Sequence, residues 1–263
     1  MGPTTAQRGE AERADTPARP PHIGPQGRGL TGRTRLVLAA VGLVLISAAT
    51  VWVLYGSSWL RLERVTSTGT EVLTRSEVEA AAAAPVGSPL ISVDTGAIAD
   101  RLRQKLPRID SVDVVRSWPH GVSLKVTERK PVLLVEKGKK FIEVDAKGVR
   151  FATVDKAPAH VPLLELTPDR SASLRRFGSD RLLREAVRVA GDLPGKVAGE
   201  TETVRVASYD SAVLELTGGR TVMWGSSEQG PVKARVLTAL MKASPKAGHF
   251  DVSAPTAPAV SKS

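Results

Sequence analysis

The chain has 263 residues, no cysteine, 4% aromatic residues and a formal net charge of +10 at pH 7. The absence of cysteine excludes disulfides and thiolate chemistry. Because the basic residues are scattered and are not interleaved with aromatic residues, the charge favours a solvated surface near anionic lipid and wall polymer over a nucleic-acid site.

Residues 1–35 are rich in Gly, Pro, Arg, Thr and Ala, with almost no large apolar residue before Leu30. Such a segment cannot bury enough apolar surface to offset the entropy lost on ordering. We expect a disordered cytoplasmic tail.

The segment 36–55 carries no charge, and as a helix it would span roughly 30 Å, the thickness of a bilayer's hydrocarbon core. Trp52, Tyr55 and Trp59 cluster at its far end, where aromatic rings favour the headgroup level. A buried core helix and a cleaved signal peptide are the alternatives. The apolar run exceeds a typical signal-peptide core, which favours an uncleaved transmembrane helix.

Basic residues flank this helix unequally. Arg28, Arg33 and Arg35 precede it, whereas Arg61 and Arg64 follow it with an acidic residue between them. The positive-inside rule therefore predicts a single-pass type II protein, with a cytoplasmic N-terminus and a large extracytoplasmic part.

The pattern of residues 59–128 predicts a small domain. A strand around Leu62 and Val65 is followed by a capping box, Thr74 to Glu77, and an alanine-rich helix that Pro85 ends. Asp94 or Thr95 can cap a second helix, and two alternating strands flank a turn at 118–121. The order strand, helix, helix, strand, strand predicts a three-stranded sheet with two helices on one face.

The pattern becomes mainly strand after Pro131, with short strands near 132–135, 141–144 and 149–152. Residues 155–180 are less readable because prolines interrupt them. A helix at 182–190, a strand at 204–207, a hairpin about Gly218-Gly219 and a second helix at 232–240 follow. We expect a last strand at 249–253 and a C-terminal tail over 255–263.

No catalytic or metal-binding set is found in the sequence. His22, His120, His160 and His249 lack metal-ligand spacing, and no nucleophile elbow or phosphate-binding loop occurs. The carboxylate pairs Glu143 with Asp145 and Asp110 with Asp113 are interpreted as solvating the outer faces of strands. We therefore expect no enzyme activity, no metal and no cofactor.

A terminal strand offers an alternative kind of function. A strand at a sheet edge exposes unpaired amides and carbonyls, to which a partner can add a strand. Pro255 and Pro258 could instead blunt this edge.

The stretch from Leu106 to Val132, LPRIDSVDVVRSWPHGVSLKVTERKPV, resembles the bacterial cell-division family FtsQ, called DivIB in some lineages. The resembling elements are Pro107, Ile109, Val112, Val114, Arg116, Trp118-Pro119, Val122, Leu124, Val126, Glu128-Arg129 and Pro131. FIEVDAKGVRF, LELTGGRTVMWG and HFDVSAPTAPAV are also similar to the family's second domain.

The resemblance implies an α+β protein: one transmembrane helix, a POTRA domain at 59–128 and a larger strand-rich β domain with two helices at 129–254. It implies a non-enzymatic divisome scaffold at the septum of the cell membrane. Its partners would be FtsB- and FtsL-like single-span proteins, through them the septal synthase FtsW–FtsI, and membrane lipid, with no nucleic acid and no small-molecule substrate.

The resemblance also implies a partner-binding segment, because an FtsB-like partner would add a strand at the end of the β domain. Carried over by the family's Asp-to-Ala-Val pattern, the residues are Phe250, Asp251, Val252, Ser253, Ala254, Thr256, Ala257, Ala259 and Val260. Only Phe250 is aromatic there, unlike in some family members, so backbone bonds rather than aromatic hot spots would dominate the contact. Arg116 and Trp118 are interpreted as structural. A POTRA-bearing secretion component and an anchored wall hydrolase remain alternatives.

Overall fold

The computed structural model describes residues 32–166 and 172–262. Helix α1 (Gly32–Val51) continues into one π-helical turn, Trp52–Gly56, and is the helix in these ranges that is long and apolar enough to cross a membrane. It begins four residues before the predicted segment and so includes Arg33 and Arg35. The helix up to Val51 and the part from Trp52 onward are two separate compact units. The predicted tail lies almost entirely outside the described residues.

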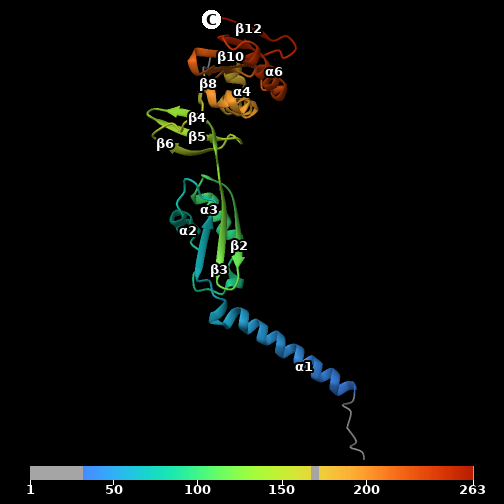
Figure 1. The fold of residues 1–263 in the computed structure, drawn as a ribbon. Helices are drawn as coiled ribbons and strands as arrows, with labels where there is room; N and C mark the ends of the chain where they lie inside the picture. The colour runs from blue at the N-terminus through green and yellow to red at the C-terminus, as the bar shows by residue number, and fades with distance from the viewer. Residues whose placement is uncertain (1–31, 167–171, 263) are drawn as a thin grey trace, which may run out of the picture. The chain divides into compact units, whose positions relative to one another are not determined.

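The small domain has the predicted order of elements (Figure 1). These are β1 (Arg64–Thr68), α2 (Arg75–Ala82), α3 (Thr95–Lys105), β2 (Ile109–Ser117) and β3 (Gly121–Glu128). The sheet order is β1-β3-β2, with β1 parallel to β3 and β2 antiparallel to it. The α+β fold class is confirmed.

Local signals in the sequence set the helix starts in this domain. The amide of Glu77 donates to Thr74 Oγ1 at 3.2 Å, and the amide of Thr74 donates to the Glu77 carboxylate at 2.8 Å, which is the predicted capping box. Of the two candidate caps for α3, Asp94 is the one used, because its carboxylate accepts from the amide of Ala97 at 2.9 Å.

The small domain has its own hydrophobic core between the helices and the sheet. Gly69 ends β1 with a φ of +83°, and a Cβ there would lie 2.1 Å from the carbonyl oxygen of Val126, so only glycine fits. The buried apolar residues are Leu62, Val78, Ala82, Leu90, Val93, Ile98, Ala99, Leu102, Ile109, Val112, Val122, Leu124 and Val126.

The larger domain is built on one mixed sheet of order β12-β11-β10-β9-β8-β7-β4-β5-β6. Its strands are β4 (Pro131–Lys137), β5 (Lys140–Asp145), β6 (Arg150–Val154), β7 (Leu163–Leu166), β8 (Thr201–Ser208), β9 (Ser211–Leu216), β10 (Arg220–Gly225), β11 (His249–Asp251) and β12 (Ala259–Ser261). The predicted hairpin is β9–β10, where Gly218 and Gly219 have φ of +77° and +75°.

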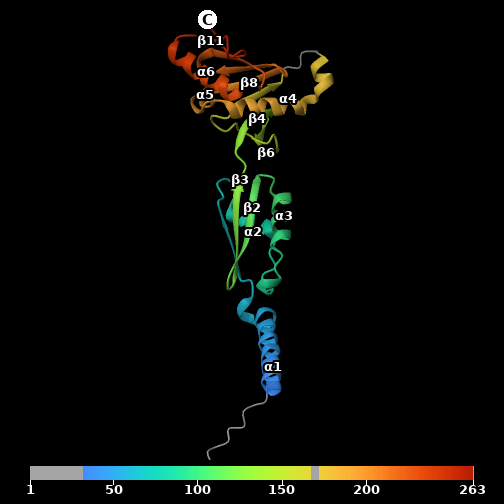
Figure 2. The same cartoon turned by 90° about the vertical axis from the view of Figure 1, so that its right-hand side faces the viewer.

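Three helices, α4 (Ala172–Asp192), α5 (Gly195–Glu200) and α6 (Gly230–Ala243), complete this domain, where two were expected. Helix α4 lies against β4, β7 and β8, and α6 packs against α4 (Figure 2). Trp224, Phe250, Leu214 and Val222 are among the core side chains, all at most 1% exposed. Successive side chains of a strand point to opposite faces of the sheet, and one face of β8–β11 packs into this core. The buried apolar residues of these strands therefore alternate with more polar ones.

The predictions fail mainly between residues 155 and 200 and at the C-terminus. Strand β7 was not predicted, although it lies in the middle of the sheet, parallel to both β4 and β8. Helix α5 was missed as well. The predicted C-terminal tail contains β12, so His249–Ser253 is not the last strand.

Candidate partner-binding edge and the junction between the domains

Strand β12 forms one edge of the large sheet. It pairs antiparallel with β11, in the register His249 to Ser261, Phe250 to Val260 and Asp251 to Ala259. In turn, β11 pairs in parallel with β10 on its other side. The edge that was predicted at 249–253 is therefore covered by the chain's own last strand, and the free edge belongs to 259–261.

The predicted partner-binding residues divide into two groups by burial. Phe250 and Val252 are 1% and 0% exposed and belong to the core of the large domain, so a partner cannot contact their side chains on the folded protein. This corrects the expectation for these two side chains. Ser253, Ala254, Thr256, Ala257, Ala259 and Val260 are exposed.

Asp251 shapes the loop that joins β11 to β12. Its carboxylate accepts from the amide of Ser253 at 2.9 Å and from the Ser253 hydroxyl at 2.7 Å. The amide of Ala257 then donates to the carbonyl of Ala254 at 3.0 Å. These local bonds reverse the chain direction so that β12 can return beside β11.

A hollow of about 370 Å³ lies beside β12, between that strand and the segment that follows α6. It is lined by Ser244, Pro245, Lys246, Ala247, Val260, Ser261 and Lys262. The amide of Gly248 donates to the carbonyl of Ser261 at 3.2 Å and so joins the two walls. The edge strand thus stands next to a space that can receive a side chain.

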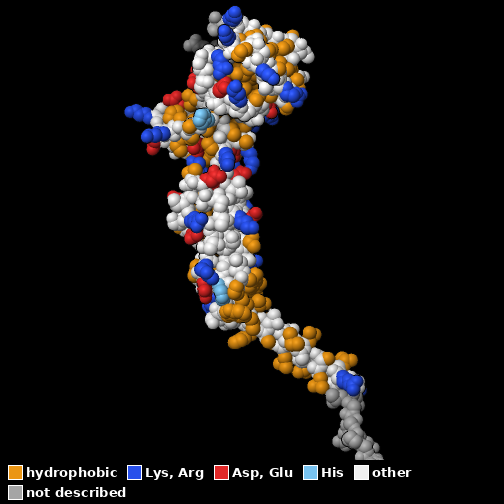
Figure 3. Space-filling model, viewed as in Figure 1, with side chains coloured by type: hydrophobic (Ala, Val, Ile, Leu, Met, Phe, Trp, Pro, Cys, Tyr) orange, Lys and Arg blue, Asp and Glu red, His pale blue; other side chains and the backbone are white. Residues whose placement is uncertain are grey.

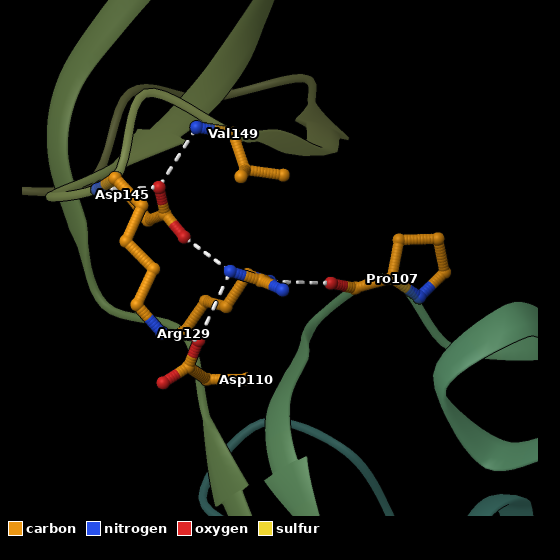
Figure 4. Close-up of polar contacts among 6 residues, drawn as sticks. Pro107, Asp110, Arg129, Asp145 and Val149 are labelled. Atoms are coloured by element: carbon orange, nitrogen blue, oxygen red, sulfur yellow. Dashed lines mark hydrogen bonds and ion pairs between the residues drawn. The ribbon is translucent and has the colours of Figure 1, made fainter. Parts of the chain in front are cut away.

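Arg129 is the centre of a charged junction between the small and large domains (Figure 4). Its guanidinium forms ion pairs with Asp145 of β5 and with Asp110 of β2, the latter at 3.0 Å, and donates to the carbonyl of Pro107 at 3.0 Å. Lys147 adds a bond to Asp110 at 2.5 Å. This bond is the main reason that the pKa of the Asp110 carboxyl lies below its usual range.

Asp145 also orders the turn that follows β5. Its second carboxylate oxygen accepts from the amides of Lys147 and Val149, at 2.9 and 2.8 Å. The same carboxylate therefore serves the turn and the ion pair with Arg129, so the shape of this turn is linked to the small domain (Figure 4).

A second contact across the junction joins Arg108 to Glu143 of β5 at 2.6 Å, and Phe151 lies 5.1 Å below the same guanidinium. Glu143 and Asp145 are 3% and 4% exposed. The expectation that these two carboxylates solvate the outer face of a strand is wrong, because each is paired with an arginine. Asp113 does lie on an exposed position of β2, whereas Asp110 is half-buried and pairs with Arg129 and Lys147.

The described residues show no group of three or more His, Cys, Asp or Glu side chains that could hold a metal ion. His120, His160 and His249 belong to separate elements, and His249 is occupied by the hydroxyl of Thr221 at 2.7 Å. His22 lies outside the described residues. Arg116 has the structural role expected for it, since it donates to the carbonyls of Leu90 and Val93. Trp118, for which a structural role was also expected, is instead 49% exposed.

Lys233 on α6 is a buried cation that the sequence analysis did not single out. It is 2% exposed, and its Nζ donates to the carbonyls of Trp224 and Ser226 at 3.0 and 2.8 Å. Burial lowers the pKa of its ammonium, and Glu228 partly opposes this shift. The sequence did contain a signal for this residue, because Lys233 falls on the apolar face of the helical pattern of α6.

A sequence profile described as the FtsQ-type POTRA domain matches residues 60–129. The cell division protein FtsQ of Streptomyces venezuelae is 62% identical over 268 residues, covering 100% of this chain and 99% of that protein. FtsQ of Streptomyces griseus is 76% identical over 208 residues, covering 79% of this chain and 100% of that protein.

A solved structure of the major extracytoplasmic domain of the cell division protein DivIB from Geobacillus stearothermophilus is also similar. It shares 17% identity, covers 44% of this chain and 94% of that one, and aligns with a TM-score of 0.33.

The membrane-length helix, the FtsQ-type POTRA domain and the larger mixed-sheet domain define a membrane-anchored protein of the POTRA class. The identity over the full chain goes further. The chain belongs to the FtsQ family of bacterial cell division proteins. Members of this family are not enzymes, so the wall-hydrolase alternative is set aside. Because the family is one of cell division proteins, the secretion alternative is set aside as well.

Proposed function

We propose that the chain is a bitopic scaffold of the division machinery, with residues 1–31 in the cytoplasm and both folded domains outside, at the septum. Family membership and the single membrane-length helix support this placement. The basic residues Arg28, Arg33 and Arg35 before the apolar segment support the orientation.

The domain limits follow from the same proposal. The small domain takes residues 59–128, and the large domain begins at 129. We extend the large domain past 254 to Ser261, because β12 is a strand of its sheet. The junction at Arg129 then lies at the domain boundary itself.

The partner is an FtsB-like single-span protein that acts together with an FtsL-like protein. Through these two proteins the chain is linked to the septal synthase FtsW–FtsI. The observation that carries this proposal is the position of β12, which among residues 32–166 and 172–262 is the outermost strand of its sheet and pairs only with β11. An added partner strand would satisfy the backbone groups on the outer side of β12.

Side chains near this edge suit such a partner. Val260 is 36% exposed and lines the hollow beside β12, so an apolar side chain of the partner strand can enter there. Pro255 and Pro258 lie before β12, so its three residues retain their backbone N–H groups. Ser253, Ala254, Thr256 and Ala257 flank the strand and contact the partner through the loop.

The test compares Val260→Pro with Val260→Ala in full-length protein that carries a fluorescent fusion at its N-terminus. Proline removes a backbone donor from the edge strand, whereas alanine keeps the backbone and shortens only the side chain. We expect Val260→Pro to lose co-purification of the FtsB-like partner and Val260→Ala to retain most of it.

Val232→Ala on α6 is the matched control, because Val232 is 37% exposed, close to the 36% of Val260, and lies outside the proposed binding segment; this variant should bind normally. The unfolding temperature of each variant separates a lost contact from a misfolded domain. Equal partner recovery with Val260→Pro and the parent would contradict strand addition. An even membrane signal of the parent fusion through the cell cycle would contradict the septal role.

A further inference from the structure

Three segments meet at the end of the small domain where the chain enters it. Arg64 of β1 and Ser117 of β2 both pair with Gly121, the first residue of β3. The amides of Glu63 and Arg64 donate to the carbonyl of His120 at 2.9 and 3.2 Å. The turn 118–121 is therefore held beside residues 63 and 64.

The loop 85–89 is held at the same end. The amide of Leu62 donates to the carbonyl of Ser88 at 2.9 Å, and the amide of Gly87 donates back to the carbonyl of Leu62 at 2.7 Å. The guanidinium of Arg61 also donates to the carbonyl of Gly87, at 2.9 Å. Both loops are thus fixed by backbone bonds to residues 61–64.

These segments expose large apolar side chains together. Trp59 is 64% exposed, Val86 65% and Trp118 49%. Figure 3 shows hydrophobic side chains gathered at this end of the small domain. An aromatic and aliphatic surface of this kind on a folded domain marks an interaction site. We call the surface of Trp59, Val86 and Trp118 the entry surface.

The distance along the chain bounds how far Trp59, one residue of the entry surface, can lie from the membrane. The membrane-length helix ends at Gly56, and Trp59 follows three residues later. Three residues reach at most about 10 Å. The headgroup layer on each side of the hydrocarbon core is itself roughly 5–8 Å thick, so Trp59 cannot lie far from it.

We propose that the entry surface is seated in the headgroup layer of the bilayer that holds the chain's own anchor. Tryptophan rings favour this layer because they are apolar with one polar N–H group. The docking holds the small domain against the membrane in one orientation, so that the short segment between Gly56 and Trp59 is not its only link. The proposal rests on the membrane anchor and not on the identity of any division partner.

The charges around the entry surface agree with a lipid surface as the occupant. Arg61 and Arg64 are exposed beside it, with Glu63 between them. A hollow of about 230 Å³ is lined by Arg64 and Trp118, together with Thr66, Ser117, Pro119, His120 and Gly121. An arginine next to an indole at this depth suits the phosphate of a lipid headgroup.

The opposite end of the same domain is different in character. There the Glu128 carboxylate accepts from the amides of Glu71, Val72 and Leu73, and Lys130 pairs with Glu71 on the surface. Val72 is an exposed apolar residue at that end, and its exposed fraction is 65%, the same as that of Val86. The domain therefore offers a matched control position away from the entry surface.

The test uses the absence of cysteine from the chain, which lets a single introduced cysteine be labelled alone. Val86→Cys and Val72→Cys are made in the full-length protein, labelled with the same fluorophore and placed in nanodiscs of phosphatidylcholine and phosphatidylglycerol, one copy per disc. A quencher attached to lipid headgroups is then added. We expect the label at position 86 to lose most of its fluorescence and the label at position 72 to keep most of it.

A second set of variants tests whether the tryptophans hold the contact. Trp59→Ser and Trp118→Ser together, in the Val86→Cys background, should restore at least half of the quenched signal. Since both side chains are exposed, the unfolding temperature should change little, and it is measured to show that the domain is intact.

Equal quenching at positions 86 and 72 would overturn the proposal, as would quenching at position 86 that survives loss of both tryptophans. Discs that hold two copies are prepared separately, and quenching at position 86 that occurs only in these discs would assign the entry surface to self-association and would also overturn the proposal. Incorporation of the protein into discs is scored separately, so a failed anchor is distinguished from a failed docking surface.

Discussion

Arg108 and Glu143 lie 35 positions apart in sequence, yet their side chains meet at 2.6 Å across the junction of the two domains. The two side chains are 14% and 5% exposed, so the pair is largely removed from water. Breaking such a pair is costly because the remaining charge stays buried without a counter-charge. The junction is therefore a place where small changes have large effects on stability.

Arg108→Met should destabilise the large domain by roughly 3 kcal/mol, since it leaves Glu143 buried and unpaired. The double variant Arg108→Met with Glu143→Leu should recover much of this loss, because no unpaired charge remains. Chemical unfolding of the full-length protein in detergent measures both.

Arg103→Met is the control for that comparison. Arg103 pairs with Asp100 at 2.6 Å, but both side chains are at least 50% exposed. Its loss should cost less than about 1 kcal/mol. Equal losses for Arg103→Met and Arg108→Met would show that burial of the junction pair contributes nothing.

Asp110 predicts how the junction responds to acid. The hydrogen bond from Lys147 lowers the pKa of the Asp110 carboxyl in the folded protein. Its stabilising contribution is therefore complete above the ordinary aspartate pKa of about 3.9, and is lost as the pH falls through the lowered folded value. Unfolding curves from pH 7 to pH 3 should show Asp110→Asn less stable than the parent at pH 7, with the gap closing below about pH 4. A gap that stays constant with pH would contradict this assignment.

Lys233 affects the stability of the protein at alkaline pH. Burial lowers the pKa of its ammonium in the folded protein. Between this lowered pKa and the ordinary lysine pKa of about 10.4, Lys233 carries a proton in the unfolded chain but has lost it in the folded chain. Unfolding then takes up a proton, and this group makes the protein more stable as the pH rises through the window.

The variant Lys233→Met tests this. It removes the titrating group but leaves the carbonyls of Trp224 and Ser226 without their Nζ donor, so it should be less stable near pH 10. Its deficit should shrink as the pH falls and the parent lysine becomes charged. A deficit that grows toward lower pH would show that the ammonium is the favoured form in the core.

Local signals explain which parts of the fold could be predicted. The capping box at Thr74 and Glu77, the cap at Asp94 and the alternation of Val122, Leu124 and Val126 each involve residues within a few positions of one another. The free energy that sets these elements is local, so the pattern alone indicates them.

Strand β7 shows why other parts could not be predicted. Its four residues, Leu163 to Leu166, gain their partners from β4 and from β8, which are remote in the sequence. A run this short carries no period that separates a strand from a loop. Strand β12 is a similar case, because only the turn at Asp251 returns three residues of an Ala- and Ser-rich end to the sheet.

The sequence by itself determined the membrane-length helix, the strand-helix-helix-strand-strand domain and the family, because apolar length, caps and alternation are properties of neighbouring residues. Only the tertiary structure decided which residues are exposed and which are buried or paired. It buried Phe250 and Val252, moved the open edge to 259–261, paired Glu143 and Asp145 with arginines and gathered Trp59, Val86 and Trp118 at one end. Burial and pairing depend on contacts between distant segments, and no local pattern contains them.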